Sequence, residues 1–81
     1  MKNNEQKLNV LLHEIQIMLN ESDVRKDDNF IELGGNSIMA MQIVQTLKIR
    51  DGILVNLAQL LGTSISQIEL IRVDDGSKEG K

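Results

Sequence analysis

The hydrophobic core of this chain must be built from aliphatic side chains, and this requirement limits the folds that it can adopt. Phe30 is the only aromatic residue, and the sequence contains neither proline nor cysteine. With 81 residues the chain forms one small domain, and it has no disulfide or thiolate metal site to add stability. Leu, Ile, Val and Met supply most of the 41% of residues that are hydrophobic. This composition favours a small all-α bundle over a β-sandwich or barrel.

Apolar residues with helical spacing predict two long helices. The first covers residues 8–19, with Asn3 or Asn4 as its cap, and the second covers residues 37–50 and ends at Asp51-Gly52. One face of each helix would enter the core, formed by Leu8, Leu11, Leu12, Ile15, Met18 and Leu19 in the first helix and by Ala40, Ile43, Val44 and Leu47 in the second.

Two further helices are predicted from residue pairs with capping-box spacing. In such a box, a cap residue and a Glu or Gln three positions later satisfy backbone N–H groups at a helix start. Asn56 with Gln59, and Ser64 with Gln67, follow this pattern. They predict a short helix over residues 57–61 and a fourth helix over residues 65–72. The expected fold is therefore a four-helix bundle with a short third helix.

A long polar segment, residues 20–36, separates the first two helices. It is rich in Asp, Asn and Gly and has no sustained period. Connections longer than about 12 to 15 residues are uncommon in small domains and are often functional, so we expect an ordered loop with a role of its own. Its apolar residues should anchor it to the bundle, and they are Val24, Phe30, Ile31 and Leu33.

Charge and hydropathy exclude several classes of partner. Nine Lys and Arg against twelve Asp and Glu give a net charge of -3, which argues against nucleic acid. No apolar run approaches the roughly 20 residues that span a bilayer, so a cytoplasmic monomer with no membrane contact is expected. Residues 1–73 are expected to form the functional domain. Residues 74–81 contain no apolar side chain and are expected to be a disordered tail.

The sequence contains no recognisable set of residues for conventional nucleophilic or metal catalysis. There is no cysteine, and the single histidine, His13, lies on the first helix without a serine or carboxylate at a triad spacing. We therefore expect no catalytic residue, no metal site and no enzymatic activity. His13 is expected to be an ordinary surface or half-buried side chain.

The most unusual local feature is the run Gly34-Gly35-Asn36-Ser37, which ends the loop and opens the second helix. Taken alone, it is a flexible turn followed by a helix cap, since Asn and Ser are preferred caps. A hydroxyl at this position would also lie where backbone N–H groups and the helix dipole favour an attached phosphate. The two glycines would leave that hydroxyl open to an approaching enzyme.

The wider sequence from Asp28 to Ile38, DNFIELGGNSI, resembles the D-x-F-x-x-L-G-G-x-S-[LI] signature of phosphopantetheine-dependent carrier proteins. It is most similar to the peptidyl carrier, or thiolation, domains of nonribosomal peptide synthesis, and the resemblance covers about residues 5–73. It implies that Ser37 carries a covalent 4′-phosphopantetheine arm, on which aminoacyl, peptidyl or acyl groups are held as thioesters. Gly34, Gly35 and Asn36 would form the turn that presents Ser37.

The resemblance also implies a set of partner enzymes. These are a phosphopantetheinyl transferase that uses coenzyme A and Mg²⁺, an adenylating or acyl-loading enzyme, and a condensing or tailoring enzyme. Ile38 and Met41 lie off the core stripe of the second helix and match positions that peptide-type carriers use for partner contacts. The start at Met1 and the short tail suggest a free-standing carrier, with an excised synthetase domain as the alternative.

Three alternatives remain open from the sequence. A fatty-acid or polyketide acyl carrier is similar, but such carriers tend to be more acidic and to have Asp where this chain has Asn36. Residues 57–68 also resemble a helix-turn-helix, although Glu69 is the only charged residue between positions 53 and 71, which argues against DNA binding. A helical adaptor without a prosthetic group would leave the Gly-Gly-Asn-Ser run unexplained.

Overall fold

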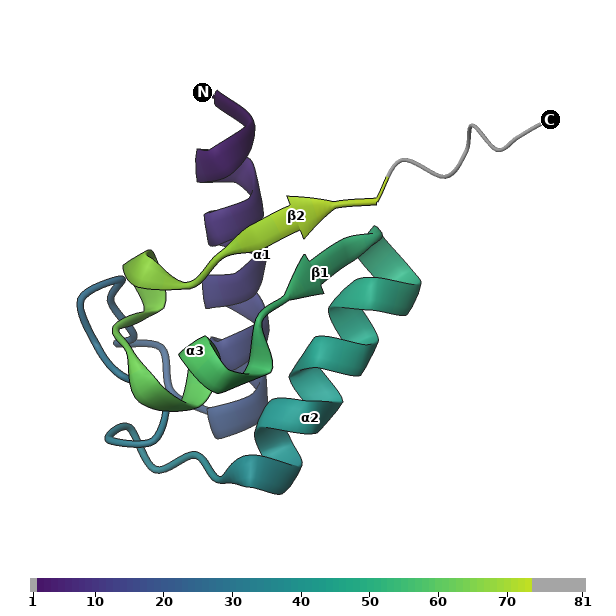
Figure 1. Ribbon diagram of the computed structural model, residues 1–81. Helices are drawn as coiled ribbons and strands as arrows, with labels where there is room; N and C mark the ends of the chain where they lie inside the picture. Colours follow the sequence, from purple (N-terminus) through teal and green to yellow (C-terminus); the bar gives the residue numbers. More distant parts are fainter. Residues whose placement is uncertain (1, 74–81) are drawn as a thin grey trace, which may run out of the picture.

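Two inclined helices that approach each other at one end of the molecule form the frame of the structure, a computed structural model that describes residues 2–73 (Figure 1). Helix α1 covers Lys2–Leu19 and helix α2 covers Ser37–Thr46, continued by a π-helical turn over Leu47–Asp51. Helix α3 is short, Leu57–Gly62. These helices correspond to three of the predicted four, but α1 begins at Lys2, so Asn3 and Asn4 lie within it and the prediction that one of them caps it is wrong. The predicted disordered tail at residues 74–81 lies outside the described residues.

The region predicted to be the fourth helix forms a 3-10 turn and a strand, so the mostly helical character of the predicted fold is confirmed but an all-α four-helix bundle is not. Residues Ile65–Gln67 form one 3-10 turn, and strand β2, Leu70–Arg72, then pairs antiparallel with strand β1, Ile53–Val55. Leu54 lies opposite Ile71 in this small sheet. The fold is therefore mostly helical with a two-stranded sheet beside α1 (Figure 1).

Local hydrogen bonds show that only the Asn56 half of the first capping box forms and that the second box does not form. Asn56 caps α3 as predicted, with its Oδ1 accepting from the N–H of Gln59 at 3.0 Å. The Gln59 side chain, however, accepts from the N–H of Glu69 and holds that residue in extended backbone. Ser64 makes no side-chain capping bond. The β-branched residues around β1 and β2 then favour pairing over a further helix.

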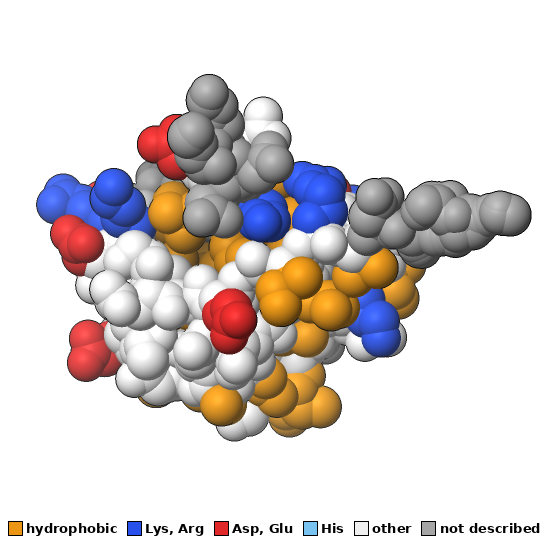
Figure 2. All heavy atoms as spheres, turned by 45° about the horizontal axis from the view of Figure 1, so that its top comes forward, with side chains coloured by type: hydrophobic (Ala, Val, Ile, Leu, Met, Phe, Trp, Pro, Cys, Tyr) orange, Lys and Arg blue, Asp and Glu red, His pale blue; other side chains and the backbone are white. Residues whose placement is uncertain are grey.

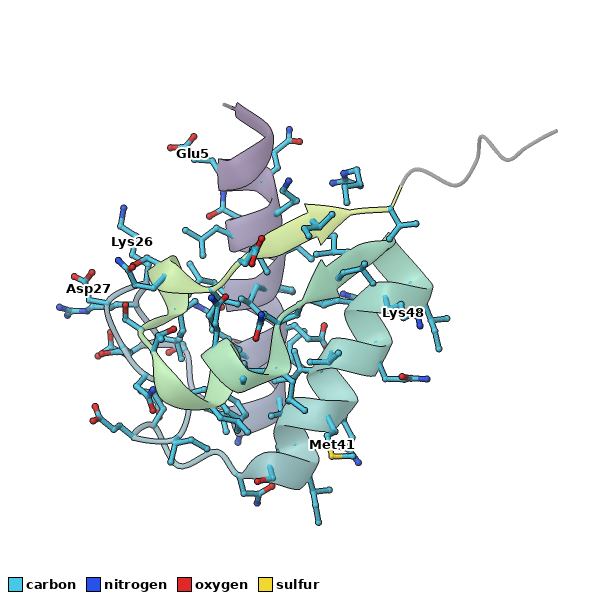
Figure 3. The ribbon with its side chains drawn as sticks, viewed as in Figure 1. Glu5, Lys26, Asp27, Met41 and Lys48 are labelled. Carbon is cyan, nitrogen blue, oxygen red and sulfur yellow. The ribbon has the colours of Figure 1, made fainter. Side chains whose placement is uncertain are left out.

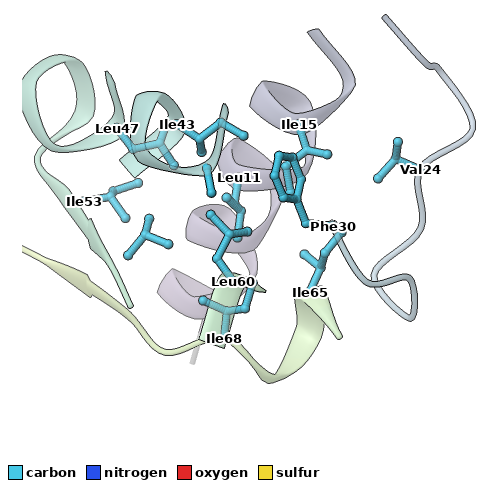
Figure 4. Packing of buried hydrophobic residues seen from close by; sticks show 12 residues of the cluster. Leu11, Ile15, Val24, Phe30, Ile43, Leu47, Ile53, Leu60, Ile65 and Ile68 are labelled. Carbon is cyan, nitrogen blue, oxygen red and sulfur yellow. The ribbon is translucent and has the colours of Figure 1, made fainter. Parts of the chain in front are cut away.

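The core joins both helices, the sheet and the loop in one aliphatic cluster around a single ring. Figure 4 shows Phe30 reaching from the loop into this cluster. Phe30 is fully buried, Val24 is 7% exposed and Leu33 is partly buried, as expected for anchors, but Ile31 is 39% exposed and is not one. The predicted helix faces are confirmed, since the fully buried residues include Leu11, Ile15, Ala40, Ile43 and Leu47.

The loop is also held by backbone hydrogen bonds to the segment that follows α3. The N–H of Ile65 donates to the carbonyl of Asp28 at 2.9 Å, and the N–H of Ser66 donates to the carbonyl of Lys26 at 2.8 Å. Asn29 forms an isolated bridge with Ser64. The loop is therefore ordered by contacts with a segment distant in sequence. Within the described residues, no helix has the length and apolar character needed to cross a membrane.

A buried carboxylate links α1 to the end of α2. Glu14 is buried on α1, and its Oε1 lies 3.0 Å from an Arg50 guanidinium nitrogen in the π-helical turn. Arg50 also contacts Asp51 at 2.7 Å. The hydrogen bond that Arg50 donates to the Asp51 carboxylate, and the neighbouring Glu14 carboxylate, raise the pKa of Arg50 above its usual value. Gly52 then ends the helical turn with a left-handed φ of 67°, as the sequence predicted.

The first prediction tests the Phe30 anchor. Phe30→Ala should lower the free energy of unfolding by about 3 to 5 kcal/mol, because it removes the largest fully buried side chain and leaves a cavity. That is a large share of the roughly 5 to 15 kcal/mol typical of a domain. Urea denaturation followed by circular dichroism measures it. Ile31→Ala, an exposed neighbour, is the control, and an unchanged midpoint for Phe30→Ala would show that the ring does not anchor the loop.

The second prediction concerns the buried Glu14. Arg50→Ala should be more destabilising than the double variant Glu14→Gln with Arg50→Ala, because only the single variant leaves a buried charge without its cation. Urea midpoints at pH 7 compare the two. Arg25→Ala breaks an ion pair with Asp23 whose side chains are both more than 70% exposed, so it should change stability by less than about 1 kcal/mol. A double variant that is no more stable than Arg50→Ala alone would contradict a coupled pair.

Candidate functional site

The chain reaches α2 through a tight turn that depends on two glycines. The N–H groups of Gly34 and Gly35 donate to the carbonyls of Ile31 and Phe30, each at 3.0 Å. Gly34 has a φ of 108°, a region that L side chains rarely adopt. A Cβ at position 35 would overlap the Phe30 ring. One glycine is therefore required by backbone conformation and the other by the ring beneath it.

Asn36 is the residue that caps α2. Its Oδ1 accepts from the N–H of Met39 at 2.9 Å, and its carbonyl accepts from the N–H of Ala40 at 2.9 Å. The sequence left Asn36 and Ser37 as equally plausible caps, and the structure assigns the role to Asn36. A neutral amide provides the same cap bond as Asp without adding a charge.

Ser37 is consequently free of the capping role and open to solvent. It is the first residue of α2, it is exposed, and no hydrogen bond of its hydroxyl is found among the described residues. The N–H groups of Ser37 and Ile38 precede the first internal hydrogen bond of the helix, so they can face an anion. A phosphodiester on the Ser37 oxygen would fit this position, because the side chain is unobstructed and the nearby N–H groups suit phosphate oxygens.

The surroundings of Ser37 contain little that could activate it. The segment from Gly34 to Leu47 has no Asp, Glu, His, Lys or Arg. Among the described residues, no group of three or more potential ligands could hold a metal ion. His13 is exposed on α1, as expected for an ordinary surface histidine.

An apolar groove runs along α2 next to Ser37. Ile38 is 69% exposed and Met41 is 56% exposed, which confirms that both lie outside the core. Figure 3 shows Met41 on α2, with Lys48 towards the other end of the same helical rod. The groove has a volume of about 420 Å³ and is lined by Ile38, Met41, Gln42, Val44, Gln45 and Leu57. Its walls are thus apolar or neutral.

The acidic and hydrophobic side chains are unevenly distributed over the surface. In Figure 2 the hydrophobic side chains collect towards the right of the visible face beside several Lys and Arg side chains, and most acidic side chains lie towards the left. The sequence analysis found Ile38 and Met41 but missed Val44 and Leu57, because Val44 was placed wholly in the core and Leu57 only opened a helix. Asn29, whose side chain links two segments, was missed as well, although an Asn next to a buried Phe in a turn is a recognisable signal.

The helix-turn-helix alternative is wrong for this structure. A recognition helix would have to follow Gly62, but residues Ile65–Gln67 form only one 3-10 turn before β2 begins. Between Gly62 and Val73, where the described residues end, no second α-helix follows α3 that could enter a DNA groove.

Comparison with known proteins identifies the family. A family model described as "Phosphopantetheine attachment site" matches residues 9–69, which is most of the chain. Comparisons with curated proteins and with solved structures gave no significant match. Carrier domains of this family hold 4′-phosphopantetheine covalently on a serine, are generally non-catalytic, and work with a phosphopantetheinyl transferase and partner biosynthetic enzymes. The chain therefore belongs to the phosphopantetheine attachment site family and is a phosphopantetheine-bearing carrier protein.

Proposed function

We propose that Ser37 carries the 4′-phosphopantetheine arm and that the protein delivers aminoacyl or peptidyl thioesters in nonribosomal peptide synthesis. The observation that carries this proposal is the exposed Ser37 hydroxyl at the start of α2, directly after the Gly34-Gly35 turn. The arm supplies the thiol that a chain without cysteine lacks. The other serines described here lie outside any comparable turn, and Ser64 and Ser66 face each other at 3.5 Å.

The roles of the chain's own residues follow from the geometry. Gly34 and Gly35 allow the backbone to turn over Phe30, and Asn36 starts the helix so that the Ser37 oxygen stays unbonded. The transferase would supply the base and Mg²⁺, and the serine oxygen would displace 3′,5′-ADP from coenzyme A. No residue of this chain is proposed to be catalytic.

The peptidyl type is favoured over the acyl type by charge. Both α2 and α3 are free of charged residues, and the signature has Asn36 where fatty-acid carriers tend to have Asp. A partner that recognised this face would therefore need apolar contacts rather than a basic patch. We assign the contact to Ile38 and Met41, which line the groove beside Ser37, and the partners to an adenylating or loading enzyme and a condensing or tailoring enzyme.

The third prediction tests the attachment site. Incubation with coenzyme A, Mg²⁺ and a broad-range transferase should add one phosphopantetheine to the intact mass, and peptide mapping should locate it at Ser37. Ser37→Ala should abolish the gain and change stability by less than about 0.5 kcal/mol, because Asn36 makes the cap bond. Ser64→Ala is the control and should be modified normally. Modification of Ser37→Ala at another serine would refute the assignment.

The fourth prediction tests the partner surface. Ile38→Glu and Met41→Glu should each keep stability within about 0.5 kcal/mol, because both side chains are mostly exposed. Loading of the modified carrier by its adenylating enzyme should slow at least tenfold, because a carboxylate would be buried against an apolar partner. Steady-state loading rates and urea midpoints measure the two effects.

Two variants serve as controls for this surface. Ile49→Glu makes the same change at a position that is 72% exposed, beyond α2, so loading should remain normal. Ile43→Glu places the carboxylate at a fully buried position and should unfold the domain. If Ile38→Glu unfolded the protein as Ile43→Glu does, or if it left loading intact, the proposed contact would be wrong.

A further inference from the structure

One side chain of the loop joins two segments that are far apart in sequence. Asn29 Nδ2 donates to the carbonyl of Thr63 at 2.9 Å, across to the end of α3. Asn29 Oδ1 accepts from the N–H of Glu32 at 3.0 Å, within the loop itself. We propose that Asn29 is a positioning residue for Ser37, because its amide fastens the turn before Ser37 to the segment after α3. This inference rests on the proposed role of Ser37.

The position requires a donor and an acceptor in one short side chain. The Thr63 carbonyl lies at the end of α3, where backbone carbonyls have no partner within the helix and need a donor. The Glu32 N–H needs an acceptor at the same time. Only a side-chain amide offers both at this length, since an ionised Asp accepts bonds but donates none. Asn29→Asp would therefore keep the bond to Glu32 and lose the bond to Thr63.

The fastened turn leads directly to the serine. The backbone carbonyl of Asn29 accepts from the N–H of Leu33 at 3.1 Å, and the carbonyl of Phe30 accepts from the N–H of Gly35 at 3.0 Å. Gly35 lies against the Phe30 ring, two residues before α2 begins, so the position of the turn determines the position of the first residues of α2. The backbone bonds from Ile65 and Ser66 hold the neighbouring part of the loop to the same segment. The Asn29 amide extends this attachment to the turn itself.

A loosened turn should affect recognition of the carrier and not the chemistry of the transfer. If only a fraction of molecules presents Ser37 correctly, the apparent affinity for the transferase falls in proportion to that fraction. Asn29→Ala and Asn29→Asp should each raise the KM for the carrier by up to about tenfold, the upper limit set by the loss of one or two hydrogen bonds, and leave kcat unchanged. Steady-state modification at saturating coenzyme A measures both constants.

A matched control separates positioning from a general loss of stability. Ile53→Val removes one buried methylene group at the other end of the core from Phe30, as Figure 4 shows, and should lower the denaturation midpoint without raising KM. A wild-type KM for both Asn29 variants, or an equal rise of KM for Ile53→Val, would overturn the proposal.

Hydrogen exchange provides a second measurement that needs no transferase. In the unmodified protein, Asn29→Ala should speed exchange of the Gly35 amide by about tenfold and leave unchanged the exchange of the Leu47 amide, which directly follows α2. Unchanged exchange at Gly35 would overturn the positioning role even if Ser37 is modified. Failure of the wild-type protein to be modified at Ser37 would instead overturn the proposed function, and the exchange result would still decide whether Asn29 fastens the turn.

Discussion

The contact between the Phe30 ring and the Gly35 backbone is the constraint on which the rest of the site depends. The ring is fully buried, and it fills the space that any side chain at position 35 would need. The loop is therefore tied to the core at the point where the chain turns into α2. The only aromatic side chain of the core, Phe30, therefore supports the Gly34-Gly35 turn that leads to Ser37.

The long loop is ordered because it forms hydrogen bonds with a segment much later in the chain. Backbone bonds from Ile65 and Ser66, and the Asn29 amide bond to Thr63, hold it in place. The same later segment continues into β2, which pairs with β1 beside α1. The sheet and the loop therefore depend on one stretch of chain, and a change in that stretch would reach both of them.

The site combines a rigid base with an uncharged surface. Asn36 provides the helix cap as a neutral amide, and the stretch from Gly34 to Leu47 contains no charged residue. Such a surface gives little electrostatic steering, so complementary apolar shape has to supply the selection of partners. This is the physical reason why the proposed contacts centre on Ile38 and Met41, next to a serine whose hydroxyl makes no hydrogen bond among the described residues.

Sequence alone determined the features that depend on neighbours a few positions apart. The helical spacing located α1, α2 and the buried faces of both, the Asn56 cap located α3, and the carrier signature led to the family that the family model then matched. Ser37 as the attachment residue stays a prediction from that signature. Phe30 could be recognised as an anchor because a single ring in a polar stretch has few other uses.

Only the tertiary structure decided the features that depend on distant partners. Residues 70–72 became a strand because β1 offered them backbone groups, and because the Gln59 side chain took the N–H of Glu69. The exposure of Ile31 and the double bonding of Asn29 likewise follow from where the turn lies against residues 63–66. A capping pattern reflects hydrogen bonds between residues three or four positions apart. Whether residues 70–72 form a helix or pair with residues 53–55 depends on contacts between distant segments, and a local sequence pattern does not record these.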